Sequence, residues 1–254
     1  MSGIFDGKVV VITGGSRGIG RAIVLGALER GASVVFCGRT LGEASDEVLS
    51  AADALGARDR VLAVQADVSS EADVEALFDR TLERFERVDA AVNNAAVSRD
   101  DLLLRMPTEV FDEVIANNLT GPFLVARRAV QEFLGQGEGG AIVNIGSLSQ
   151  NGATSQAAYS ASKGGLQGLT RSIAKEYGRR GVRANVVVGG YVQTRMSDQI
   201  PEAFRTFLVD HCPLRRLGEP EEVADIALFL ASERASFING ESIHATGGLV
   251  DVPL

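Results

Sequence analysis

The segment from residue 8 to residue 31 constrains the fold of this chain more than any other. Residues 8–13 read Lys-Val-Val-Val-Ile-Thr, an apolar β-branched run that predicts a strand buried on both faces. Glycines follow at positions 14, 15, 18 and 20, and residues 21–30 then have the apolar spacing of a helix that stops at Gly31. In a strand, glycine turn and helix of this kind, backbone N–H groups can approach a pyrophosphate closely. The segment therefore predicts a dinucleotide site, although its glycine spacing differs from the usual G-x-G-x-x-G, and a glycine-rich turn without a ligand is the alternative.

Strands and helices alternate along the rest of the chain. The predicted strands are residues 8–13, 33–37, 61–65, 89–93, 141–145, 183–188 and 242–245, and the amphipathic segments include residues 71–85, 108–133, 158–179 and 220–231. Ser70 followed by Asp73 is expected to cap the helix that starts at residue 71. Such alternation implies a parallel sheet with helices on both faces and a ligand crevice at the carboxyl ends of the strands. No linker or repeat divides the chain, so we expect one doubly wound Rossmann-type α/β domain with a seven-stranded parallel sheet over residues 1–254.

Composition and charge exclude several classes of function. The 254 residues carry a formal net charge of −8, and without a basic cluster this opposes nucleic-acid binding. The first residues have no basic start and no apolar core, so we expect no signal peptide, and no run of 18 apolar residues predicts a membrane span. Cys37 and Cys212 need no bridge in a reducing cytoplasm, where we expect the protein. His211 and His244 lack partners at metal-ligand spacing, so no metal site is predicted.

A second pattern concerns reaction chemistry. Tyr159 and Lys163 are four residues apart, with Ser147 twelve residues before Tyr159. In a helix this spacing places the phenol and the ammonium on one face. A nearby ammonium favours the phenolate, so we expect the pKa of Tyr159 to fall below its ordinary value of about 10. Such a pair can act as acid and base on an alcohol or a ketone. Taken alone, the pattern equally fits a partly buried tyrosine beside a solvated lysine.

Several motifs in register resemble the short-chain dehydrogenase/reductase family. They are the run from Thr13 to Gly20, the run from Asn93 to Ala96, Asn118, Ser147, the Tyr159-x-x-x-Lys163 pair and Thr194. The resemblance extends from Phe5 to about Leu249. Within the family, residues 98–106 and 213–220 are most similar to the branch of 3-oxoacyl-carrier-protein reductases.

The resemblance implies a catalytic tetrad of Asn118, Ser147, Tyr159 and Lys163. Tyr159 would donate a proton to a carbonyl oxygen that Ser147 also binds, and Lys163 would hold the nicotinamide ribose as well as lower the tyrosine pKa. Asn118 would anchor a water that links Lys163 to solvent, and Thr194 would hold the nicotinamide carboxamide. Taken singly, Ser147 could end a strand, Asn118 could bind backbone, and Thr194 could cap a helix.

The same resemblance implies the cofactor site. Its residues would be Gly14, Ser16, Arg17, Gly18, Ile19, Gly20, Arg39, Asp67, Val68, Asn94, Ala95, Tyr159, Lys163, Gly190, Val192 and Thr194. Arg39 follows the second strand, where NAD-binding folds place an acidic residue, and its guanidinium would pair with the 2′-phosphate of NADP. Arg17 could add a second guanidinium. The site therefore predicts NADP(H), with two solvated surface arginines as the alternative; Asp67 would contact the adenine amino group or cap a helix.

The predicted activity is NADPH-dependent reduction of a ketone, most similar to reduction of a 3-oxoacyl thioester on an acyl carrier protein or coenzyme A, of the fatty-acid or polyketide type. The alternatives are a short-chain enzyme acting on a free alcohol or ketone and a non-catalytic NADP-binding regulatory protein. An acidic carrier would need a basic patch, for which the candidates are Arg127, Arg128, Arg171, Arg179 and Arg180.

Two further expectations concern the substrate and the assembly. Residues 194–216 would form a lid in which Phe204, Phe207 and Leu208 either line an apolar chain or serve in packing. The family implies a homotetramer formed through the segments 108–133 and 158–179 and the last strand. The apolar residues 249–254 would then be buried between subunits.

Overall fold

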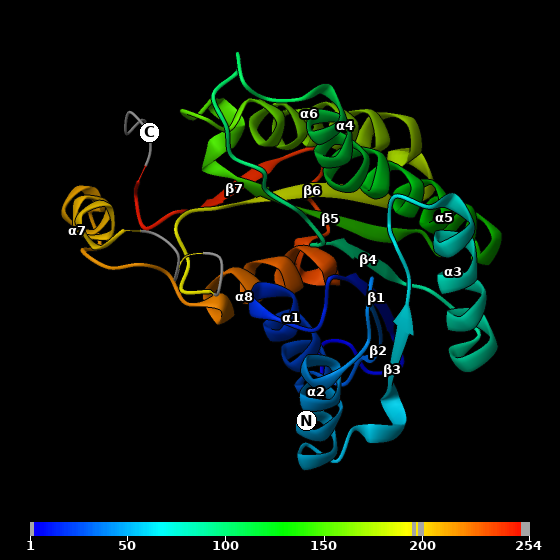
Figure 1. The fold of residues 1–254 in the computed structure, drawn as a ribbon. Helices are drawn as coiled ribbons and strands as arrows, with labels where there is room; N and C mark the ends of the chain where they lie inside the picture. Colours follow the sequence, from blue (N-terminus) through cyan, green and yellow to red (C-terminus); the bar gives the residue numbers. More distant parts are fainter. Residues whose placement is uncertain (1–2, 195–196, 198–200, 250–254) are drawn as a thin grey trace.

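The computed structural model describes residues 3–194, 197 and 201–249 and contains a seven-stranded parallel sheet (Figure 1). The strand order is β3-β2-β1-β4-β5-β6-β7. The strands are β1 (Val9–Thr13), β2 (Ser33–Gly38), β3 (Val61–Gln65), β4 (Ala90–Asn93), β5 (Gly140–Ser147), β6 (Val182–Gly189) and β7 (Ser242–Ala245). All seven predicted strands are present, so the predicted Rossmann-type α/β fold is confirmed. The order reverses between β1 and β4, and in such sheets the ligand crevice lies at that reversal.

Helices cover both faces of the sheet (Figure 1). One apolar core joins the sheet to α1 (Gly18–Glu29), α2 (Glu43–Ala54) and α8 (Pro220–Ala231). A second core joins the other face to α3 (Glu71–Phe85), α5 (Gly121–Gln136) and α6 (Ala157–Tyr177). The remaining elements are α4 (Thr108–Ile115), α7 (Glu202–His211), η1 (Arg58–Arg60), η2 (Ala116–Thr120), η3 (Leu148–Asn151), η4 (Gly178–Arg180) and η6 (Glu233–Ala235). Within the described part of the chain, no helix is long and apolar enough to span a membrane.

The local signals of the sequence explain how these elements start and stop. All five residues of β1 are buried, as its apolar run predicts. Helix α3 begins where expected, because the Ser70 side chain accepts a hydrogen bond from the Asp73 backbone N–H at 3.3 Å. Helix α1 ends at Glu29, and Gly31 follows with φ +95°, a conformation that favours glycine.

The predicted helix over residues 108–133 is present as three consecutive pieces. Between α4 and α5, η2 is a π-helical turn in which the Gly121 N–H bonds the carbonyl of Ala116, five residues earlier. π-Turns inside helices are rare and occur frequently at functional sites. Asn118 lies in the middle of this turn, which directs attention to its surroundings.

Candidate active site at the carboxyl ends of the strands

The glycine turn after β1 packs directly on the segment after β4. A Cβ atom at Gly20 would overlap the Gly14 carbonyl and lie 2.5 Å from Asn94 Nδ2, and one at Gly14 would lie 2.9 Å from Ala95 Cα. Asn94 Nδ2 donates to the carbonyls of Thr13 and Gly14, each at 3.0 Å. Four of the predicted cofactor residues are therefore in one close-packed cluster that leaves no room for side chains at the two glycines.

Residues from the far end of the chain complete this side of the site. A Cβ at Gly18 would lie 3.3 Å from Thr194 Cγ2, so Thr194 is next to the start of α1. Gly190 lies against the backbone of Thr246, where a Cβ would be 2.9 Å from the Thr246 Cα. Val192 is buried and forms an isolated parallel bridge with Gly218. Thr194 thus lies against the start of α1, whereas Gly190 and Val192 contact Thr246 and Gly218, and the roles of all three in cofactor binding stay predictions.

Two exposed arginines lie on the outer side of the turn. Arg17 directly precedes α1, and Arg39 directly follows β2. A Cβ built at Gly38 would lie 4.0 Å from Ser16 Oγ, so the end of β2 is beside the glycine turn. A helix N-terminus and two guanidinium groups suit the phosphates of a dinucleotide chemically, because all three attract anions.

Asp67 has a defined place beside the next strand. Its Oδ1 accepts hydrogen bonds from the Ser69 N–H at 2.9 Å and from Ser69 Oγ at 2.7 Å. The cap of α3 is Ser70, so Asp67 does not serve as that helix cap. Val68 is buried and packs against Gly121 at the start of α5. A contact between Asp67 and adenine stays a prediction.

Three of the four predicted catalytic residues come together where β5 and α6 meet. Ser147 is the last residue of β5, and its side chain is hydrogen-bonded to that of Tyr159. Lys163 Nζ lies 5.6 Å from the centre of the Tyr159 ring and donates to the Ile145 carbonyl at 2.7 Å. Lys163 is only 3% exposed. The i,i+4 spacing therefore does place the phenol and the amine side by side in α6, as predicted.

The pKa of Tyr159 differs from the expectation. Burial raises it, the hydrogen bond to Ser147 offsets part of this rise, and the charge of Asp100 adds to it. Burial also lowers the pKa of Lys163 to about 8. The expected lowering of the phenol pKa by Lys163 is thus not found. The reason is that the environment of the half-buried Tyr159 disfavours the phenolate, while the burial of Lys163 disfavours the ammonium that would stabilise it.

Asn118 forms hydrogen bonds with Val97 and Ser162. Its Oδ1 accepts from the Val97 N–H and its Nδ2 donates to the Val97 carbonyl, both at 2.8 Å. Nδ2 also donates to Ser162 Oγ at 3.2 Å, and Ser162 Oγ donates to the Tyr159 carbonyl at 2.7 Å. Asn118 therefore ties the segment after β4 to the first turns of α6. Its predicted role in holding a water stays a prediction.

Sequence reasoning missed the carboxylate of Asp100, which lies next to the start of α6. Asp100 accepts from Ser98 Oγ at 2.6 Å and from Gln156 Nε2 at 3.1 Å, and Gln156 directly precedes α6. The charge of Asp100 raises the pKa of Tyr191 as well as that of Tyr159. The sequence signal was available only as part of the family-like segment 98–106.

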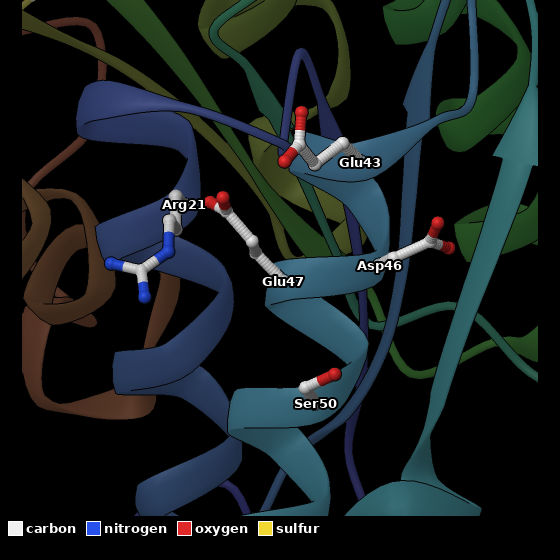
Figure 2. A pocket seen from close by; sticks show the side chains of 5 residues that line it. All are labelled: Arg21, Glu43, Asp46, Glu47 and Ser50. Atoms are coloured by element: carbon white, nitrogen blue, oxygen red, sulfur yellow. The ribbon is translucent and has the colours of Figure 1, made fainter.

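A separate groove of about 560 Å³ opens between α1 and α2 (Figure 2). Its lining residues are Arg21, Glu43, Asp46, Glu47 and Ser50, and the Glu47 side chain extends toward Arg21. None of them belongs to the predicted cofactor or catalytic set. Three carboxylates against one guanidinium make this groove a poor match for an anionic dinucleotide. In the described part of the chain, this groove included, no cluster of three or more histidine, cysteine or acidic side chains could hold a metal ion.

Comparisons with known proteins agree with this fold and site. A family model described as "Enoyl-(Acyl carrier protein) reductase" matches residues 14–250. The 3-oxoacyl-[acyl-carrier-protein] reductase of Escherichia coli (strain K12) is 37% identical over 246 residues, which cover 96% of this chain and 98% of that protein. The enzyme of the same name from Aquifex aeolicus (strain VF5) is 39% identical over 247 residues, with the same coverage.

A solved structure is similar to this chain in shape. The crystal structure of a "putative gluconate dehydrogenase" from Agrobacterium tumefaciens matches with a TM-score of 0.92 and 32% identity over 98% of both chains. Fold, site and relatives together define an oxidoreductase that uses a nicotinamide cofactor, NAD(P)(H). The chain belongs to the short-chain dehydrogenase/reductase family, and the curated relatives named above are 3-oxoacyl-[acyl-carrier-protein] reductases.

Proposed function

We propose that this protein is an NADPH-dependent reductase that converts the ketone of a 3-oxoacyl thioester to an alcohol. The observation that carries the proposal is the hydrogen-bonded Ser147–Tyr159 pair beside the buried Lys163. It occurs in a chain that matches 98% of the length of 3-oxoacyl-[acyl-carrier-protein] reductases. The thioester is carried by coenzyme A or by an acyl carrier protein.

The side chains of the site have distinct tasks in this reaction. A bound nicotinamide supplies the hydride. Tyr159 donates a proton to the carbonyl oxygen, and its raised pKa keeps the phenol protonated at neutral pH. Ser147 binds the same oxygen and stabilises the negative charge that develops on it. Lys163, whose pKa is about 8, can hold or release a proton near neutral pH and so can restore the proton of Tyr159.

The preference for NADPH rests on Arg17 and Arg39. Both are exposed on the outer side of the glycine turn, and neither forms an ion pair with an acidic side chain among the described residues. A 2′-phosphate there would gain a charge-assisted contact that the 2′-hydroxyl of NADH lacks.

A row of aromatic side chains beside the site supports the proposal that the substrate carries an apolar acyl chain. Tyr191 and Phe204 meet edge to face with ring centres 6.1 Å apart, and Phe204 stacks on Phe207 at 5.9 Å. Phe204 is 37% exposed, so its ring is available to a substrate, whereas Leu208 is fully buried in the core below α7. Leu208 is therefore a packing residue. The predicted lid over residues 194–216 includes positions 195–196 and 198–200, which lie outside the described residues.

The surface restricts where an acidic carrier protein could bind. Arg127 pairs with Glu71, and Arg128 pairs with Glu75, Asp79 and Glu132, with its side chain only 11% exposed. These two arginines are therefore already paired with carboxylates, which makes them weaker candidates for docking an acidic carrier. The remaining candidates are the exposed Arg171 in α6 and the exposed Arg179 and Arg180 in η4. We propose that any carrier docks there.

The assembly is a separate proposal. We propose a homotetramer formed through α5, α6 and β7, which light scattering would contradict if the protein were monomeric at micromolar concentration. Leu249 is buried against its own chain, and residues 250–254 lie outside the described residues. A cytoplasmic location also stays a prediction.

A second candidate is a dehydrogenase of a free hydroxy compound. It is favoured by the similarity to a protein titled as a gluconate dehydrogenase and by the neutralised Arg127 and Arg128. A third, a non-catalytic NADP-binding regulatory protein, is opposed by the assembled Ser147, Tyr159 and Lys163. NADPH consumption that is lost in Tyr159→Phe would eliminate it.

One experiment separates the candidates. NADPH oxidation is measured with acetoacetyl-coenzyme A, with a small acetoacetyl thioester and with a panel of free ketones, and NADP⁺ reduction is measured with gluconate. The proposal predicts the highest kcat/KM for the thioesters. Turnover of gluconate or a free ketone at a kcat/KM above that of both thioesters would replace it with the second candidate.

A further inference from the structure

Asp100 is fixed beside the start of the helix that carries the catalytic phenol. Its two carboxylate oxygens accept from Ser98 Oγ at 2.6 Å and from Gln156 Nε2 at 3.1 Å. The next residue, Asp101, forms a parallel bridge with Gln156, and its N–H donates to the Ser155 carbonyl at 2.9 Å. Because α6 begins at residue 157, the carboxylate is tied to the chain just before the turn that contains Tyr159.

The charge of Asp100 is not neutralised by its neighbours. Arg99 pairs with Glu113 at 2.9 Å, and Arg105 pairs with Asp101 at 2.9 Å. Over residues 3–194, 197 and 201–249, no lysine, arginine or histidine forms an ion pair with Asp100. Its negative charge acts instead on the two nearby phenols, since it raises the pKa of both Tyr159 and Tyr191. The Asp100 carboxylate is therefore an exposed anion without an ion-pair partner, and it contacts the side chain of Gln156, three residues before Tyr159.

We propose that Asp100 is a specificity-determining residue that disfavours 3-oxo acids with a free carboxylate and thereby selects their neutral esters and thioesters. This inference rests on the proposed function and names the chemical form of its substrate. In a free 3-oxo acid, the carboxylate is separated from the ketone by one CH₂ group, whereas the thioester at the same position is uncharged. Repulsion of the wrong substrate is a common source of specificity. A repulsion of about 1 kcal/mol, typical of two unit charges that face water, changes kcat/KM about fivefold.

The test compares a charged and a neutral form of one substrate. In Asp100→Asn, the amide oxygen can still accept from Ser98, and the Gln156 amide can turn to offer its oxygen to the new NH₂ group. With NADPH, kcat/KM is measured for acetoacetate and for its N-acetylcysteamine thioester. We expect the ratio of the anion to the thioester to rise about fivefold in the variant, and to rise less in about 1 M salt because salt screens the repulsion. An unchanged ratio would overturn the proposal.

Two variants distinguish charge from structure. Asp101→Asn removes the adjacent carboxylate, which is paired with Arg105, and should leave the ratio at the wild-type value. Gln156→Ala breaks the contact to Asp100 but keeps its charge, so any loss should affect both substrates alike. If Asp100 had only a structural role, Asp100→Asn would likewise change both substrates in parallel.

A binding measurement separates this inference from the proposed function. The fluorescence of bound NADPH is titrated with 3-hydroxybutyrate and with its methyl ester, in the wild type and in Asp100→Asn. If the wild type turns over no thioester, the proposed function fails, yet a selective gain in affinity for the anion in the variant would still support the role of Asp100. Equal changes for both ligands, or binding of neither in both proteins, would contradict that role.

Discussion

The two sides of the crevice depend on different physical properties. On the nucleotide side, Gly14 and Gly20 pack against Asn94 and Ala95 so closely that a single added carbon atom has no space. On the catalytic side, Tyr159 and Lys163 are ionisable groups whose pKa values burial has moved. The nucleotide side is therefore defined by close packing, and the catalytic side by the cost of placing charge on a half-buried phenol and a buried amine. Substitutions should accordingly damage the two sides in different ways.

The largest expected effect is on the catalytic side. Tyr159→Phe removes only the hydroxyl group and should lower kcat about 10²- to 10⁴-fold, because a positioned general acid contributes that much. NADPH binding should be nearly unchanged, which separate titrations of affinity and steady-state rates will check. Tyr177→Phe, at the other end of α6, is the matched control and should retain wild-type kcat. Equal activity in Tyr159→Phe and the wild type would remove the phenol from the mechanism.

The next effect concerns charge on the nucleotide side. Arg39→Ala should reduce the preference for NADPH over NADH about 10- to 100-fold, since a charge-assisted contact to the 2′-phosphate is lost. The preference is the ratio of the two kcat/KM values. Arg58→Ala, an exposed arginine in η1, should leave this ratio unchanged. No change for Arg39→Ala would show that the arginine is only a solvated surface residue.

A methyl group added to the glycine turn tests the close packing of the nucleotide side. Gly20→Ala should destabilise the protein by about 1–3 kcal/mol and weaken cofactor binding, because the new methyl group meets Gly14 and Asn94. Gly168→Ala, on α6, has no heavy atom within 4 Å of its new Cβ and should be neutral or stabilising by up to about 1 kcal/mol. Urea unfolding of both variants measures the difference. Equal stabilities would contradict the close packing of the turn.

The smallest effect is a gain in stability on the catalytic side. The lowering of the Lys163 pKa from 10.5 to about 8 corresponds to a cost of about 3 kcal/mol for the buried ammonium. Lys163→Met removes this cost and also the hydrogen bond to the Ile145 carbonyl, which is worth about 1–2 kcal/mol. The inactive, cofactor-free variant should therefore be more stable than the wild type by about 1–2 kcal/mol at neutral pH.

The difference in stability between Lys163→Met and the wild type should depend on pH. Below pH 8 both the folded and the unfolded lysine are protonated, so the cost is present in full. Between pH 8 and 10.5 the folded protein releases the proton while the unfolded chain keeps it, so wild-type stability rises relative to the variant. The advantage of Lys163→Met should shrink over that range, and the exposed Lys175→Met should not reproduce this trend. An advantage that grows with pH would contradict a buried ammonium.

Much of the fold could be predicted because its signals are local. Buried strands such as β1 are continuous β-branched runs, and Gly14 to Gly20 marks the turn that follows. The side-by-side placement of Tyr159 and Lys163 follows from helical spacing alone. The approach of Thr194 to Gly18 is different, because only the family resemblance, and no local pattern, relates residues so distant in the chain.

The remaining features depend on the tertiary environment. The π-turn around Asn118 arises where α4 passes into α5, and its sequence has the same apolar spacing as an ordinary helix. Arg128 is held by acidic residues of α3 that lie about fifty positions earlier, so its neutralisation is not visible in its own segment. The rise in the Tyr159 pKa comes from burial, which depends on every element packed around it.

The most direct test is a spectroscopic titration of the Tyr159 phenol. The phenolate absorbance of the cofactor-free wild type is followed with pH, and that of Tyr159→Phe is subtracted. Because burial disfavours the phenolate of Tyr159, the difference curve should have its midpoint above the ordinary phenol pKa of about 10. A midpoint below that value would mean that Lys163 stabilises the phenolate after all, and it would contradict the account.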